Sequence, residues 1–237
     1  MVRRLGWAVA LGVFLFLLHH AGVVSGALAP PPGYEPAWTL RNLDVPQYLT
    51  WLEAARHEVL LPDYHAPWVT EPGLFQPLLL AAARTGLPTL VAYYAPVLAG
   101  YIFAAFALLH AASVFCPGRE TLFALLAALC TVPFRLIGWL LAQVLPLPKV
   151  LVVLGLIDYS YDTADGLFRG GMSNSVTLSV GTALVLLSMA ALGRFAESGQ
   201  RKYLFRLAAL AFLSAFLHPF EVFVIVAAAA IPLLFGR

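Results

Sequence analysis

Long apolar runs separated by shorter polar segments dominate the chain. A helix of about 20 apolar residues is long enough to cross a membrane. The pattern predicts a first span at about 5–26 and remaining spans within about 88–235, beginning with 90–115, 121–144 and 172–192. Two shorter runs follow at 204–217 and 220–235, and they form either a tight hairpin or one kinked helix. We therefore expect about five or six spans.

The longest polar segment, residues 41–77, follows the first span and has a different pattern. From Asp44 to Val59, apolar residues recur at three- and four-residue spacing, which predicts an amphipathic helix lying along the membrane surface. Asp44 is a favourable N-cap, and Gln47 three residues later resembles the partner in a capping box. Prolines then recur at positions 62, 67, 72 and 77 and predict irregular backbone around acidic, histidine and aromatic side chains.

The distribution of charge predicts the side of the membrane that each segment occupies. Arg3 and Arg4 precede the first run, and residues 194–206 hold four basic residues against one acid, as is typical of cytoplasmic segments. The loop at about 27–73 is rich in acids and is expected outside the cytoplasm. Ala27-Leu28-Ala29 resembles a signal-peptidase site, so cleavage is an alternative to an uncleaved first span. Both interpretations place the loop outside.

Composition excludes a soluble protein. Hydrophobic residues make up 61% of the chain and charged residues 11%, against roughly 25% charged residues in soluble domains. The net charge of +2 is too small to indicate a nucleic-acid partner. Cys116 and Cys130 lack the spacing of a metal site or disulfide framework and are interpreted as apolar side chains. The predicted fold class is an all-α, polytopic transmembrane helical bundle, a single membrane domain over 1–237 whose extracytoplasmic loop carries the amphipathic surface helix.

Several polar residues fall where lipid is expected. Arg135 lies in the third predicted span, and His218 and Glu221 lie between the last two apolar runs, so each needs a partner, an interface or a cavity. His19 and His20, in the first apolar run, are expected at the membrane interface. A second outer loop holds three aspartates that favour either turns or ligand binding, namely Asp158, Asp162 and Asp165.

Three stretches carry a resemblance to a known class of enzymes. The stretch LDVPQYLTWLEAAR, followed by VTEPGLFQP and later by His218-Pro219-Phe220, resembles the N-terminal portion of GT-C polytopic membrane glycosyltransferases, including uncharacterised bacterial members. The resemblance implies transfer of a sugar from a polyprenyl-phosphate carrier to an acceptor hydroxyl, on the extracytoplasmic side of a bacterial inner membrane. It also implies that an acid in the first outer loop is the catalytic base or lies beside a metal. By position in the loop, this acid is Asp44.

The implied reaction gives roles to further residues. A base must deprotonate the acceptor, and the charge of the departing carrier phosphate must be neutralised. The substrate-binding candidates are His57, His65, Glu71, Arg135 and His218. Asp162 and Asp165 would join Asp44 on a divalent metal that prefers oxygen ligands, such as Mg²⁺ or Mn²⁺. The expected partners are membrane lipid, the sugar donor and an acceptor that the sequence does not identify.

Three alternatives stay open beside this interpretation. Asp44 can serve as a helix cap alone, because aspartate is common at that position. A small transporter or channel subunit would use Arg135, His218 and Glu221 as a polar path through the spans, although no inverted repeat is visible. A non-catalytic assembly protein, or a fragment of a larger transferase truncated at its C-terminus, is the third.

Overall fold

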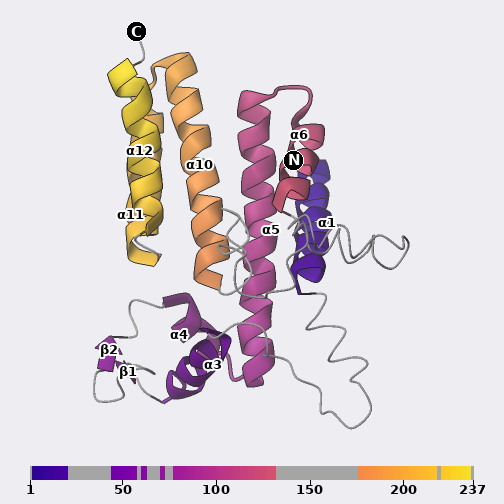
Figure 1. The fold of residues 1–237 in the computed structure, drawn as a ribbon, viewed down its shortest axis with the longest axis vertical. Helices are drawn as coiled ribbons and strands as arrows, with labels where there is room; N and C mark the ends of the chain where they lie inside the picture. The colour runs from indigo at the N-terminus through magenta and orange to yellow at the C-terminus, as the bar shows by residue number, and fades with distance from the viewer. Residues whose placement is uncertain are drawn as a thin grey trace, which may run out of the picture.

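The structure, a computed structural model, describes residues 2–20, 44–57, 60–62, 70–72, 77–131, 176–217 and 220–235. These residues form a bundle of helices with a layer of short elements at one end (Figure 1). The bundle consists of α1 (Val2–His19), α5 (Thr89–Phe115), α6 (Glu120–Thr131), α10 (Val176–Ser198), α11 (Arg201–Leu217) and α12 (Phe220–Phe235). The layer consists of α3 (Asp44–Ala54), β1 (Leu60–Pro62), β2 (Thr70–Pro72) and α4 (Pro77–Ala83). The helical fold class is confirmed, and the two short strands are an addition that the sequence analysis missed.

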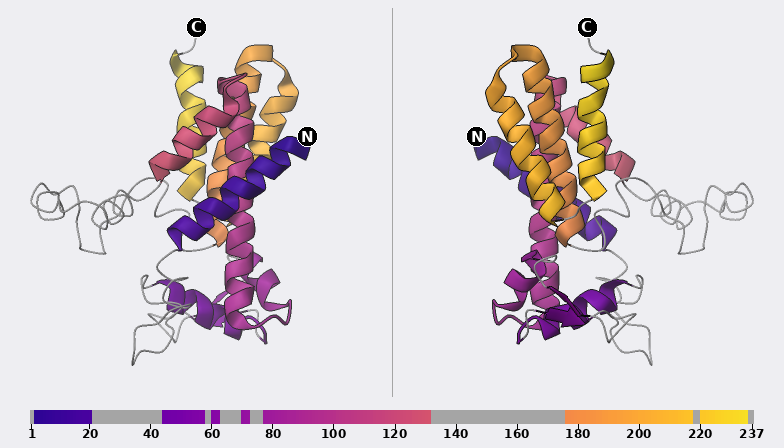
Figure 2. Two further views of the ribbon diagram at one scale, coloured as in Figure 1. Left: turned by 90° about the vertical axis from the view of Figure 1, so that its right-hand side faces the viewer. Right: turned by 90° about the vertical axis from the view of Figure 1, so that its left-hand side faces the viewer.

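Helix α5 is the centre of the bundle. Helices α1 and α10 pack against it from different sides, as Figures 1 and 2 show. Half of the buried residues of α5 are alanines, and Gly100 is also buried. Such small residues let neighbouring helix backbones approach closely, which is the usual way that membrane helices pack. Short side chains on α5 therefore allow its close contacts with the neighbouring helices.

The contact between α1 and α5 is tightest at Gly12. A Cβ atom at this position would lie 2.5 Å from Cα of Ile102 and 2.8 Å from its backbone nitrogen. Because both atoms belong to the backbone of α5, they cannot move without displacing that helix. Gly6, in the same helix, has no neighbouring atom within 4 Å of its Cβ position. Gly12 therefore fixes how closely the two helices approach.

Two glycine turns and one hairpin connect the helices at the ends of the bundle. Gly118 (φ 80°) lies in the turn from α5 to α6, and Gly199 (φ 64°) lies in the turn from α10 to α11. This left-handed conformation commonly ends helices and is available to glycine without strain. Helices α11 and α12 lie side by side and both contact α10 (Figure 2). The last two apolar runs therefore form a hairpin, because Pro219 disfavours helical backbone at the residue before it.

Three predicted boundaries differ from the observed ones. The predicted first span extends to residue 26, whereas α1 ends at His19 and residues 21–26 lie outside the described ranges. The surface helix, predicted to reach Val59, ends at Ala54 because its last turn tightens, with the amide of His57 donating to the carbonyl of Ala54 at 3.0 Å. Helix α10 continues to Ser198, beyond the predicted end at 192, and Arg194 pairs with Glu197 one turn later in this polar extension.

Among the residues that the structure describes, two helical segments are long and apolar enough to cross a membrane, judged by length and composition. They are Thr89–Phe115 and Ser179–Ser198. Helix α1 contains a shorter apolar stretch, Arg4–Leu17, and α11 and α12 have 17 and 16 residues. The expected five or six spans stay a prediction. On α11 and α12, large aromatic side chains are more than 70% exposed, which is unusual in water and ordinary in lipid; they are Phe205, Phe212 and Phe223.

Candidate functional site

The elements α3, β1, β2 and α4, here called the cap layer, lie at the end of the bundle where α5 begins (Figure 1). Helices α3 and α4 contact each other and the start of α5, and α3 also contacts β1. The strands are antiparallel, with Leu60 opposite Pro72, Leu61 opposite Glu71 and Pro62 opposite Thr70. The stretch predicted to be irregular thus holds a short ladder, with a proline at the end of each strand, where a missing backbone donor costs least.

Apolar contacts fix the cap layer to the bundle. Leu52 and Ala55 are fully buried and belong to the same core cluster as Ala82 of α4 and Tyr93 of α5. Burying a leucine side chain contributes roughly 1.5–3 kcal/mol. The predicted amphipathic helix is therefore packed against the bundle as part of its core, and its position along the membrane surface stays a prediction.

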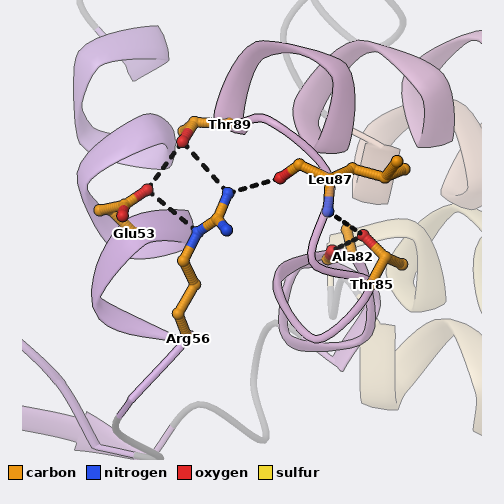
Figure 3. A network of polar contacts seen from close by, with 6 residues as sticks. All are labelled: Glu53, Arg56, Ala82, Thr85, Leu87 and Thr89. Atoms are coloured by element: carbon orange, nitrogen blue, oxygen red, sulfur yellow. Dashed lines mark hydrogen bonds and ion pairs between the residues drawn. The ribbon is translucent and has the colours of Figure 1, made fainter.

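A network of hydrogen bonds and an ion pair also joins the end of α3 to the start of α5 (Figure 3). The Thr89 hydroxyl, at the start of α5, donates to Glu53 Oε2 at 2.7 Å. Arg56 Nη2 donates to the Leu87 carbonyl at 2.7 Å and to Thr89 Oγ1 at 3.2 Å, while its Nε lies 3.1 Å from Glu53 Oε2. The hydroxyl of Thr89, the first residue of α5, thus contacts both the carboxylate of Glu53 in α3 and the guanidinium of Arg56 in the turn after α3. We call these residues the tether.

The tether perturbs the acid at its centre. The hydrogen bond from Thr89 lowers the pKa of Glu53; partial desolvation opposes this shift, and the charge of Arg56 adds to it. A carboxylate whose pKa is lowered by docking contributes its stabilisation above its ordinary pKa. This contribution is lost as the pH falls through the lowered value. The tether is therefore complete at neutral pH and weakens on acidification.

Removing the Thr89 hydroxyl is expected to loosen the cap layer without unfolding the bundle. In Thr89→Val the Glu53 carboxylate and the Arg56 guanidinium lose their shared partner, so the amides of α3 should exchange with deuterium severalfold faster at neutral pH. The difference from the wild type should shrink at acidic pH, where protonation of Glu53 has already weakened the tether.

The matched control is Thr85→Val. The Thr85 hydroxyl donates to the Ala82 carbonyl at 2.6 Å in the turn after α4, and accepts a long hydrogen bond of 3.4 Å from the Leu87 amide, but no described contact joins it to Glu53 or Arg56. The α3 exchange of Thr85→Val should equal that of the wild type. Equal exchange in both variants and the wild type would contradict a role for Thr89 in docking.

A histidine is buried where α1 reaches the cap end of the bundle. His20 is only 6% exposed and stacks on Phe16 with ring centroids 4.4 Å apart. Its ring also meets Tyr94 and Tyr101 edge-on, each at 5.8 Å, and its Nδ1 lies 2.9 Å from the Phe16 carbonyl. Rings of α1 and α5 thus enclose His20, and its expected position at the membrane interface stays a prediction. Hydropathy could not reveal this cluster, since it depends on how α1 packs on α5.

The predicted site residues fall in two groups. Asp44 begins α3, Glu71 lies in β2, and His57 is exposed in the turn after α3, so all three belong to the cap layer or its edge. The others lie outside the described residues, namely His65, Arg135, Asp162, Asp165 and His218. Within the described ranges, no three histidine, cysteine, aspartate or glutamate side chains are grouped to hold a metal ion. The metal site with Asp44, Asp162 and Asp165 therefore stays a prediction.

The arrangement offers a folded, polar layer fixed across one end of an apolar bundle. Such a layer presents the backbone at Asp44 in a defined place. No protein-family model, curated protein or solved structure matches this chain.

Proposed function

We propose that the protein is an integral membrane transferase that moves a sugar from a polyprenyl-phosphate-linked donor to an acceptor hydroxyl outside the cytoplasm. The observation that carries the proposal is the cap layer itself. The helix that Asp44 begins is docked on the bundle by buried leucine and alanine side chains and by the tether. A catalytic acid needs such a fixed place, because misplacement by about 1 Å can cost 100-fold in rate.

The distribution of charge along the bundle supports the proposal that the cap layer lies outside the cytoplasm. Arg4 lies 3.5 Å from Glu120, so the starts of α1 and α6 lie together. A Cβ atom on Gly193 would lie 3.0 Å from Val114, so the end of α10 lies beside the end of α5. We call this end, opposite the cap layer in Figure 1, the basic end. Its basic residues are Arg4, Arg119, Arg194, Arg201, Lys202 and Arg206. By the positive-inside rule the basic end faces the cytoplasm and the cap layer faces outward.

The chemistry of the proposed reaction fits what the cap layer offers. Sugar transfer from a phosphate carrier needs a carboxylate to accept the acceptor's proton, and positive charge to receive the leaving phosphate. Asp44 supplies the carboxylate, while His57, His65, Glu71, Arg135 and His218 are the proposed substrate contacts. A lipid-linked donor would reach the cap layer along the apolar surface of the bundle, so its carrier never has to leave the membrane.

The test is sugar transfer in membranes that contain the protein. Membranes should be supplied with a panel of radiolabelled polyprenyl-phosphate sugars and compared with membranes from the same cells without the protein. We expect a labelled product, extractable apart from the donor, with at least one donor, and we expect it on the extracytoplasmic face of oriented vesicles. No product from any donor would contradict the proposal and favour a non-catalytic assembly protein. Product on the cytoplasmic face would contradict the orientation alone.

A further inference from the structure

A groove opens at the basic end of the bundle, between the start of α1, the end of α5 and the start of α6. Its volume is about 690 Å³, and its lining includes Arg4, Trp7, Leu109, Arg119, Glu120 and Leu122. This volume lies within the roughly 300–1,000 Å³ typical of small-ligand sites. Helices α1 and α6 lie on the same side of α5, away from α10 (Figures 1 and 2), and the pair of Arg4 with Glu120 joins their starts. The groove is on the opposite end of the molecule from the cap layer.

The charged residues of the groove can bind an anion. Arg4 Nη2 lies 3.5 Å from Glu120 Oε1, with the arginine side chain 54% exposed, so the pair is long and open to solvent. Exposed pairs of this kind contribute little, and a guanidinium has five N–H donors, most of which this contact leaves free. Arg119 is exposed beside the groove as well. The lining thus holds two arginines and one carboxylate, and has a net positive charge.

The apolar residues of the groove indicate that the anion is attached to a lipid. Trp7 is 44% exposed and Leu122 is 57% exposed, although both are large apolar side chains. Tryptophan beside arginine is typical of the depth at which lipid head groups meet acyl chains. A free phosphate ion would use the arginines but gain nothing from Trp7 or Leu122. A phospholipid would use both, with its phosphate at the arginines and its chains along the apolar walls.

We infer that this groove binds an anionic phospholipid through its phosphate head group. The inference requires the bundle to lie in a membrane, but it does not depend on the proposed transfer reaction. The two therefore fail separately, since a protein that binds the lipid can lack transferase activity and the reverse also holds.

The test is a measurement of bound lipid on purified protein. Wild type and variants in detergent are mixed with equal amounts of phosphatidylglycerol and phosphatidylcholine, and retained lipid is counted by native mass spectrometry. We expect the wild type to retain phosphatidylglycerol in preference. Arg4→Gln and Arg119→Gln should each lower its apparent affinity about fivefold, because a basic residue at an anionic lipid surface contributes about that factor. Glu120→Gln, which removes the competing carboxylate, should raise it.

The matched control is Arg201→Gln, which removes an exposed charge from the basic end outside the groove. We expect no change in this variant, and unfolding temperatures should show that all variants are folded. An equal loss in Arg201→Gln would overturn the groove in favour of diffuse surface charge. Equal retention of the two lipids by the wild type would also overturn the inference. Displacement of the lipid by an equimolar amount of soluble glycerol phosphate would show that a free phosphate ester is the ligand, and would overturn the lipid assignment.

Discussion

Replacing Gly12 with alanine is expected to destabilise the bundle by about 2 kcal/mol. The new methyl group would lie 2.5 Å from Cα of Ile102, so α1 and α5 must separate along one of the longest contacts in the fold. Overpacking of this kind costs about 3 kcal/mol at the upper end of its usual range, and the better helix propensity of alanine returns about 1 kcal/mol. In a chain of this length the net loss lowers the unfolding temperature by about 4–8 °C, measurable by circular dichroism in detergent.

Gly6→Ala is the matched control for this prediction. It makes the same chemical change in the same helix, but its Cβ would meet no atom within 4 Å. Its unfolding temperature should stay the same or rise slightly, because only the gain in helix propensity remains. If Gly12→Ala were as stable as Gly6→Ala, the close approach of α1 to α5 would be wrong, and with it the enclosure of His20 by Tyr94 and Tyr101.

Hydropathy along the sequence predicts where the long apolar helices lie. It does not predict which residues of these helices contact each other. Helix α5 begins at Thr89, one residue from its predicted start, and ends at the predicted Phe115. Both ends could be predicted because the apolar run is long and is bounded by a proline on one side and a turn on the other. The contact of Gly12 with Ile102 has no such signal. In a helix that is apolar on all sides, hydropathy does not distinguish the face that meets protein from the face that meets lipid.

In the candidate site, too, the sequence predicts local structure but not long-range contacts. The start of α3 at Asp44 follows from local signals, namely a capping residue before an amphipathic repeat. The tether does not, because it joins Glu53 and Arg56 to Thr89, more than thirty residues away. Glu53 and Arg56 have helical spacing and a salt bridge between them was foreseeable, but their common partner depends on where α5 begins. Sequence patterns thus predicted α3 and missed the two strands, and only the tertiary structure reveals how the layer is held.

Replacing Asp44 with asparagine is expected to lower sugar transfer at least about 100-fold, the usual contribution of a positioned acid or base. Asparagine favours the start of a helix as strongly as aspartate does, so α3 should keep its place and the unfolding temperature should not change. Transfer is measured in membranes at matched expression, with the donor that gives product in the wild type. The matched control is Glu197→Gln, an exposed acid at the basic end that pairs only with Arg194 at 3.1 Å among the contacts described, and it should leave transfer unchanged.

The two proposed roles of Asp44 predict different responses to metal. The start of a helix favours negative charge, so an aspartate there suits metal binding as well as proton transfer. If Asp44 shares a divalent ion with Asp162 and Asp165, excess Mn²⁺ should restore part of the transfer lost in Asp44→Asn, because asparagine still offers one oxygen ligand. If Asp44 is the base, added metal restores nothing. Unchanged transfer in Asp44→Asn would contradict both roles, leave Asp44 as a helix cap, and direct the search to the acids of the second outer loop.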